Sequence, residues 1–261
     1  MSVDMFPIRF LAEIDRLPEF QMRGRKDMKV HKHGIPAWKA PFMEAVAACH
    51  SSYTLPTYDM FMERMITCLF ENNKHDPRQY ADTFRQHHAP VILNEDFEPN
   101  AGFLYRVSEL YEGGIAELYA YVMLVFAFED RIGNGLIMND MRVDWKLKLD
   151  TVVMCNGKVA GIDMHFDPDA SRHDIQIARR QREMASKRHI PIRDWNNEAV
   201  KGMPKFTLIR DDQNCLVRNG YRLFSDEAID ALLGELYEYF EIPEKKRVYH
   251  EILHQWPRRR S

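Results

Sequence analysis

The spacing of hydrophobic and polar residues changes along the chain from helical to strand-like and back to helical. Between about residues 41 and 131 it is helical, as Phe61, Met65, Cys68 and Leu69 show at i, i+4, i+7 and i+8. The segment 115–129 is apolar nearly all round, so we expect it to be the central buried helix. With Gly113-Gly114 as a separator, the pattern predicts helices at about 9–16, 61–69, 78–88, 103–111 and 115–129.

Residues 145–166 alternate as strands do, and Asn156-Gly157 lies between the two alternating runs. Asn-Gly is the strongest short-range signal of a β-hairpin, so we expect one over 147–166. Ser225 is expected to cap the last helix. The remaining expected elements are a basic helix at 171–189, strands at 206–210 and 215–218, a turn at 211–214 and the helix 226–240. This order predicts an α+β fold.

Composition restricts the classes of protein that the chain can belong to. Its 261 residues suit one large domain or two small ones, and its net charge of −3 means that nucleic-acid binding would need a local basic face. Four cysteines without a C-x-x-C pair argue against a zinc ribbon and favour reduced thiols in a cytoplasmic protein. The start has no secretory pattern, and the apolar stretch 118–128 is too short to cross a bilayer, so we expect no membrane association.

Two acidic residues, Asp150 and Asp163, interrupt the otherwise apolar strands of the expected hairpin. A carboxylate in such a strand is unfavourable unless it is paired, hydrogen-bonded or bound to a cation. Carboxylates on adjacent strands can converge, and Mg²⁺ prefers oxygen ligands of this kind. Two alternatives remain open: the carboxylates face water at strand ends, or they form buried salt bridges with Arg142 or Arg179.

The order of features in this region resembles the core of the PD-(D/E)xK nuclease superfamily. These features are an acidic residue at a strand end, a hairpin, the sequence Asp163-Met164-His165 and then a helix. The resemblance covers about residues 115–192. The order of a helical region followed by such a core is similar to that of Tn7-type transposon end-cleaving nucleases. It implies a restriction-endonuclease-like core, a small mixed sheet flanked by helices. The organisation that follows is a basic irregular arm (1–40), a helical region (41–112), the nuclease-like core (113–243) and a basic C-terminal tail (244–261).

The resemblance also implies roles for individual residues. Asp150 and Asp163 would hold Mg²⁺ or Mn²⁺, with Glu117 as an accessory ligand. His165 stands where the family has lysine, and histidine can act as a general base near neutral pH. The alternatives are that Lys148 or Lys158 supplies the charge, or that catalysis has been lost.

The expected helix 171–189 has six basic residues against two acidic ones, an excess that favours contact with phosphates, although a solvated basic face is the alternative. The candidate nucleic-acid-binding residues are Arg172, Gln176, Arg179, Arg180, Lys187 and Arg188. The expected function is metal-dependent hydrolysis of DNA phosphodiester bonds in restriction, phage defence or transposition, alone or with other protein subunits of such a complex. The alternatives are a catalytically inactive nuclease-fold subunit that binds nucleic acid or partner proteins, and a helical interaction protein with no nucleic-acid role.

Overall fold

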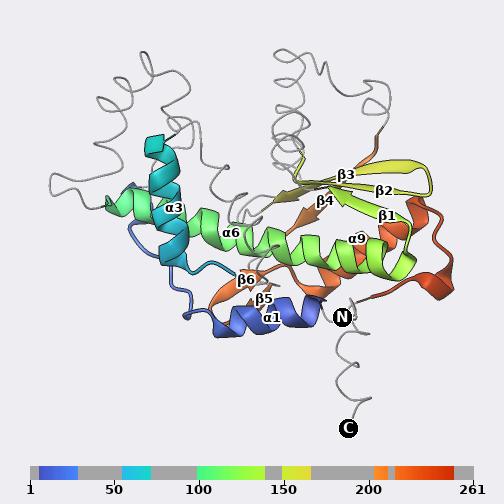
Figure 1. The fold of residues 1–261 in the computed structure, drawn as a ribbon, viewed down its shortest axis with the longest axis horizontal. Coiled ribbons are helices and arrows are strands. Elements are labelled where there is room, and N and C mark those ends of the chain that lie inside the picture. Colours follow the sequence, from blue (N-terminus) through green and yellow to red (C-terminus); the bar gives the residue numbers. More distant parts are fainter. Residues whose placement is uncertain are drawn as a thin grey trace, which may run out of the picture. The chain divides into compact units, whose positions relative to one another are not determined.

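The computed structural model describes residues 6–28, 55–71, 99–138, 149–165, 203–210 and 215–249. Helices and strands combine in an α+β arrangement (Figure 1), as the element order predicted. The helical elements are α1 (Phe6–Arg16), η2 (Lys26–Met28), α3 (Tyr58–Glu71), α6 (Ala101–Val125), η6 (Phe126–Ile132), α9 (Asp226–Tyr239) and η8 (Glu244–Lys246). The strands are β1 (Gly135–Met138), β2 (Thr151–Cys155), β3 (Lys158–His165), β4 (Lys205–Ile209), β5 (Leu216–Arg218) and β6 (Tyr221–Leu223).

The chain divides into two compact units that interleave in the sequence. Unit 1 comprises Met1–Ala12, Ala116–Val217 and Arg222–Ser261, and unit 2 comprises Glu13–Ile115 and Arg218–Tyr221. Helix α6 therefore starts in unit 2 and ends in unit 1. The predicted boundaries of the arm, the helical region, the core and the tail stay predictions.

Unit 1 contains a mixed sheet with the strand order β1-β2-β3-β4. Strands β1, β2 and β3 pair antiparallel, whereas β3 and β4 pair parallel. One face of this sheet carries the buried side chains of Ile137, Val153 and Ile162. This face lies toward α9 and the last part of α6 (Figure 1). Phe206 shares this face with its register partner Ile162 and contacts the ring of Tyr239 on α9.

The predicted hairpin is confirmed, with β2 and β3 joined at Asn156-Gly157. Both turn residues have positive φ (49° and 73°), the conformation for which Asn-Gly is favoured. The same turn meets the C-terminal end of α9, where Asn156 Nδ2 donates to the carbonyl oxygen of Phe240 at 2.8 Å. Lys158 Nζ donates to the carbonyl oxygen of Tyr239 at 2.9 Å, and a cation there also favours the helix dipole.

Several other predicted elements are confirmed. The helix expected over 61–69 lies within α3, the strand expected at 206–210 is β4, and the helix expected over 9–16 lies within α1. Ser225 caps α9, because its side chain accepts a hydrogen bond from the backbone N–H of Ala228 at 3.2 Å. Of the expected helix 171–189, no residue is described, and the helix expected at 78–88 also lies outside the described residues.

The predicted break at Gly113-Gly114 is wrong, because α6 runs through both glycines as one helix of 25 residues. Each glycine in a helix interior costs about 1 kcal/mol relative to alanine. The neighbouring Tyr111, Ile115 and Tyr119 are all fully buried, and this burial outweighs that cost. In the described part of the chain, Ala101–Ile132 is the helical stretch that is long and apolar enough to cross a bilayer, but 83% of its most apolar window is buried inside the protein. Buried core helices meet the same criterion.

Strand β1 is not among the strands that the sequence analysis predicted. Gly133 does end the π-helical segment η6, with φ of 79°. The chain then turns into β1, where the backbone N–H of Ile137 donates to Glu129 Oε1 at 2.7 Å. A helical carboxylate thus helps to fix the first strand of the sheet.

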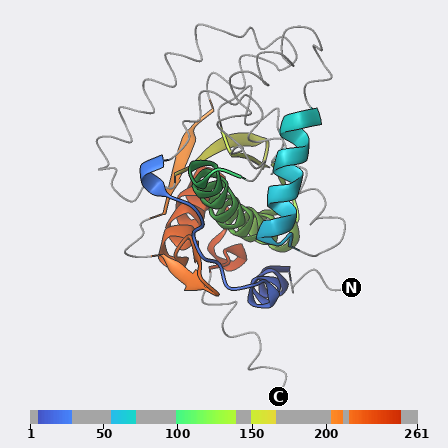
Figure 2. The same cartoon turned by 90° about the vertical axis from the view of Figure 1, so that its left-hand side faces the viewer.

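In unit 2, α3 lies beside the first part of α6, as Figure 2 shows in a view along that helix. An aromatic cluster fills the interface, in which Tyr111 contacts Tyr58, Phe61 and Tyr221. Tyr221 begins β6, which the sequence analysis missed although Asn219-Gly220 repeats the Asn-Gly signal with positive φ at both residues. Asn219 Nδ2 donates to the carbonyl oxygens of Ile14 and Leu17, so this second turn anchors the end of α1.

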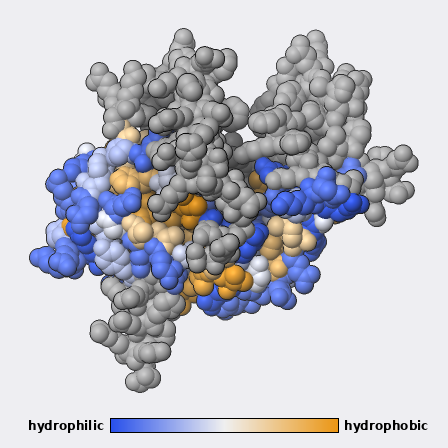
Figure 3. Space-filling view, turned by 180° about the vertical axis from the view of Figure 1, so that it is seen from behind, coloured by the Kyte–Doolittle hydropathy of each residue, from blue (hydrophilic) through white to orange (hydrophobic). Residues whose placement is uncertain are grey.

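Exposed hydrophobic side chains on the described surface are separated by polar ones, and Figure 3 shows hydrophobic areas bounded by hydrophilic ones. The large apolar residues exposed by a third or more are Met22, Met60, Leu136, Met154 and Val217. Leu136 and Met154 are register partners on β1 and β2. Dispersed apolar side chains of this kind are normal on protein surfaces, so the candidate chemistry lies with the polar groups.

Candidate functional site

Asp163 and His165 project from the same face of β3, because residues two apart on a strand point in the same direction. Met164 between them is buried against the core. Register partners share a face, so Asp163 lies opposite the face of Ile162 and Phe206 that meets α9. The predicted pair of polar residues therefore lies on the sheet face turned away from α9.

Asp150 lies next to Asp163 across the β2–β3 pair. Its backbone N–H donates to the carbonyl oxygen of Ile162 at 3.0 Å, and its carboxylate Oδ2 accepts the backbone N–H of Met164 at 2.5 Å. These two contacts flank Asp163, so the structure brings the two predicted carboxylates to neighbouring positions. The strand expected through Asp150 instead bends there, and β2 begins at Thr151.

The bend at Asp150 is related to a close contact made by the preceding residue. Leu149 packs over Gly161, where a Cβ would lie only 2.5 Å from Leu149 Cδ1. Leu149, Val152 and Met203 form a small buried cluster at this point. Glycine at 161 thus leaves the space that Leu149 fills, and this packing holds the start of β2 in position for the contact of Asp150 with Met164.

The side chains of His165 and Asp163 lie against each other. His165 Nε2 is 3.1 Å from Asp163 Oδ2, and the two side chains are only 12% and 14% exposed. Among the described residues His165 Nε2 finds no partner in hydrogen-bonding geometry, so the contact with Asp163 is one of proximity. The backbone of His165 is fixed, because its carbonyl oxygen accepts the N–H of Arg210 at 2.9 Å. The imidazole of His165 and the carboxylate of Asp163 are therefore neighbours on β3.

Strand β4 adds residues to this face that the sequence analysis missed. Its register places Thr207 beside Asp163 and Ile209 beside His165. Lys205 lies beside Gly161 on the same face. Alternation within 206–210 indicates a strand, but local sequence cannot show that this strand lies parallel to β3, because the pairing joins segments about 40 residues apart.

The other predicted site residues are distributed as follows. Glu117 is half-buried on α6. Within the described ranges no group of three or more His, Cys, Asp and Glu side chains could hold a metal ion, so the accessory role of Glu117 stays a prediction. Lys158 is the first residue of β3, directly after the hairpin turn, and its ammonium group also contacts Glu241 Oε1 at 2.7 Å. The ammonium group of Lys158 therefore lies at the end of α9. This position disfavours Lys158 as the residue that supplies the charge of the family's lysine, which is His165 in this chain.

The candidate DNA-contacting residues all lie outside the described residues, as do Lys148 and Arg142. They are Arg172, Gln176, Arg179, Arg180, Lys187 and Arg188. Their contact with phosphates stays a prediction, and so does the basic C-terminal tail beyond residue 249.

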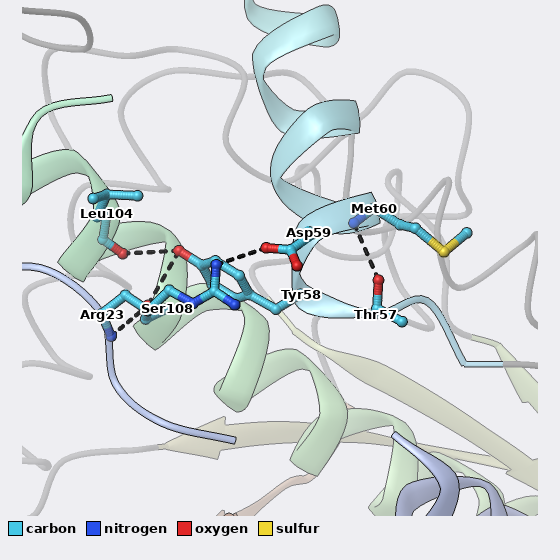
Figure 4. A network of polar contacts seen from close by, with 7 residues as sticks. All are labelled: Arg23, Thr57, Tyr58, Asp59, Met60, Leu104 and Ser108. Carbon is cyan, nitrogen blue, oxygen red and sulfur yellow. Dashed lines mark hydrogen bonds and ion pairs between the residues drawn. The ribbon is translucent and has the colours of Figure 1, made fainter. Parts of the chain in front are cut away.

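The basic arm is described from residue 6 to residue 28, and its Arg23 is engaged in contacts within unit 2 (Figure 4). Arg23 Nη1 donates to Asp59 Oδ1 at 2.6 Å, and its guanidinium lies 4.3 Å from the centre of the Tyr58 ring. The backbone N–H of Arg23 donates to Ser108 Oγ at 3.1 Å, and the Ser108 hydroxyl donates to Tyr58 at 3.2 Å. Burial raises the pKa of Tyr58, so this phenol stays neutral and available for hydrogen bonding.

A second arginine of the arm, Arg25, pairs with Asp27, with Nη2 2.6 Å from Oδ2. The positive charges of Arg23 and Arg25 are therefore balanced by the neighbouring carboxylates of Asp59 and Asp27.

The structure describes two cysteine side chains, Cys155 and Cys215, and neither is in a disulfide, in agreement with the expected reduced state of these two residues. Cys155 is buried, and burial raises its pKa, which disfavours the reactive thiolate. A nucleophilic role for Cys155 is therefore disfavoured, and the polar face of β3 remains the candidate site.

Comparison with known proteins gives no relative: no family model, no curated protein and no solved structure matches this chain.

Proposed function

We propose that the chain is a metal-dependent nuclease whose reaction takes place at Asp150, Asp163 and His165. The observation that carries this proposal is that the three residues lie close to one another, with Asp163 and His165 in contact and Asp150 bonded to the backbone of the residue between them. The antiparallel hairpin followed by the parallel strand β4 is compatible with the mixed sheet of a PD-(D/E)xK core.

The donor set fits a hard divalent cation such as Mg²⁺ or Mn²⁺ in its chemistry. Asp150 and Asp163 supply carboxylate oxygens, and water and a phosphate oxygen of the substrate would complete the coordination. Bound there, the cation would polarise the phosphoryl group and stabilise developing negative charge. The backbone N–H of Met164 donates to Oδ2 of Asp150 and orients this carboxylate.

Within this proposal the protein residues have separate tasks. Asp163 and Asp150 bind the cation, and His165 orients the attacking water and accepts its proton. The basic residues between 172 and 188 contact the phosphates of DNA. Restriction, phage defence and transposition are the settings in which such chemistry would serve, with or without further protein subunits.

A second candidate is a catalytically inactive nuclease-fold subunit that binds nucleic acid or partner proteins. It is favoured by His165 at the position where PD-(D/E)xK nucleases have lysine, and by the hydrogen bond that Asp150 Oδ2 accepts from the backbone of Met164. In this reading the three residues stabilise the β2–β3 pair and have no chemical task.

The experiment is a cleavage assay with supercoiled plasmid in Mg²⁺, Mn²⁺ or EDTA. We expect nicking by the unchanged protein in metal only, its abolition in Asp163→Asn, and a rate lower by about 10²- to 10⁴-fold in His165→Ala. Asp15→Asn removes an equivalent carboxylate from unit 2 and should cleave normally. DNA binding without cleavage in either metal would favour the inactive subunit, and no binding even at low salt would refute both.

A further inference from the structure

The residue beside Asp163 on the neighbouring strand is Thr207. Strands β3 and β4 are parallel and in register at Asp163 and Thr207, so the two side chains point from the same face. Both residues are half-buried, which places them at the boundary between the core and the outer face of the sheet. Adjacent strands lie about 4.8 Å apart, a separation that a threonine hydroxyl and an aspartate carboxylate can bridge with a hydrogen bond.

The neighbours of Asp163 approach its carboxylate from different sides. His165 contacts Oδ2 from two residues farther along β3. Asp150 lies across on β2, which is the strand on the other side of β3 from β4. Thr207 is the residue of β4 directly beside Asp163, and its two neighbours on that face of β4 are Lys205 and Ile209.

We propose that Thr207 is a positioning residue of the metal site, an inference that rests on the proposed function. Its hydroxyl donates to the Asp163 carboxylate and holds it in the orientation in which it meets the cation. Carboxylates that bind metals are themselves held by hydrogen bonds, and removing such a partner lowers metal affinity or activity by about 10- to 100-fold.

Threonine is also common in strands simply because its branched side chain suits a pleated sheet. Valine suits a strand equally well and has nearly the same shape, so Thr207→Val removes the hydroxyl while the fold is kept. Thr207→Ser keeps the hydroxyl and removes the methyl group. A purely structural role predicts that valine is tolerated and serine is the poorer replacement, whereas a positioning role predicts the reverse for metal binding.

The chain supplies a matched control in Thr151, which lies on β2 on the opposite face of the sheet, as its register partner Ile162 shows. Thr151 is fully buried, and among the described residues its hydroxyl has no hydrogen-bond partner. Thr151→Val is therefore the same substitution in the same sheet, made next to Asp150 in the chain but with the side chain on the opposite face. It should leave metal binding unchanged.

The test is calorimetric titration of the full chain and its variants with MnCl₂, with thermal unfolding as the check on folding. We expect Thr207→Val to bind Mn²⁺ about 10- to 100-fold more weakly with an unchanged melting temperature. Thr207→Ser should bind within a few fold of the unchanged protein, and Thr151→Val should bind equally. Normal Mn²⁺ binding by Thr207→Val would overturn the role of Thr207. Equally weak binding by Thr207→Val and Thr207→Ser would also overturn it, because serine keeps the hydroxyl. Either outcome would leave the carboxylate site in place. Absence of Mn²⁺ binding by the unchanged protein would overturn the metal site and the role of Thr207 together.

Discussion

The contact between Asp150 and Met164 gives a prediction that separates the structural role of Asp150 from its proposed role in metal binding. Asp150→Ala removes the acceptor of the backbone N–H of Met164, a residue that is only 5% exposed. A buried donor left without a partner costs about 1–3 kcal/mol, and a hydrogen bond to a charged group contributes about 1.5–3 kcal/mol. We therefore expect the free energy of unfolding to fall by about 2 kcal/mol. Asp150→Asn keeps an oxygen acceptor, so its loss should stay below about 1 kcal/mol.

Urea unfolding followed by far-UV circular dichroism measures both variants, and thermal unfolding gives a second reading. For a chain of this size about 2 kcal/mol corresponds to a fall in Tm of about 4–8 °C. Both substitutions remove the negative charge, so both should abolish Mn²⁺ binding, although only alanine lowers stability strongly. Stability of Asp150→Ala within about 0.5 kcal/mol of the unchanged protein would refute the structural role. An equal loss in Asp150→Asn would show that the charge of Asp150, and not its acceptor oxygen, stabilises the strand pair.

Two further predictions concern unit 2. Gly24 has φ of 84°, and a Cβ added there would lie 2.0 Å from the carbonyl oxygen of Ala101. Gly24→Ala should therefore destabilise unit 2 by at least about 2 kcal/mol and speed trypsin cleavage after Arg25. The control is Gly157→Ala, at similar φ but with no atom nearby, which should lower the free energy of unfolding by only about 1–2 kcal/mol. Unchanged cleavage would contradict this reasoning. The Arg218 guanidinium holds the pKa of Asp15 below its usual 3.8, so the pair stabilises the fold above that pH and the contribution is lost as the pH falls through the lowered pKa. Asp15→Asn should therefore lower stability by about 0.2–1 kcal/mol near neutral pH and by progressively less as the pH falls below 3.8, and a difference independent of pH in thermal melts would contradict the assignment.

Local sequence determined the elements whose signals lie within a few residues. The hairpin follows from alternation around Asn156-Gly157, since both residues accept the positive φ of the turn. Helix α9 follows from Ser225, whose side chain satisfies a backbone N–H that the helix itself cannot. The second Asn-Gly pair, at 219 and 220, carried the same information, and β6 could have been predicted from it.

Of the candidate site, the sequence supplied Asp150, Asp163 and His165, because a polar residue in an apolar strand stands out at any position. It could not supply Thr207, which resembles any other β-branched strand residue until its strand is paired with β3. Nor could it show that Asp150 ends a bend and bonds to Met164, because that contact depends on Leu149 packing over Gly161.

Tertiary structure decided the features in which burial or pairing outweighs local preference. Gly113-Gly114 would end an exposed helix, but α6 continues because its residues are buried on nearly every side, and burial is worth more than the two glycines cost. The parallel pairing of β4 with β3 likewise depends on hydrogen bonds between distant segments, which no short window of sequence contains. The sequence by itself thus determined which residues could carry chemistry, and the pairing of the strands determined which of them share a face.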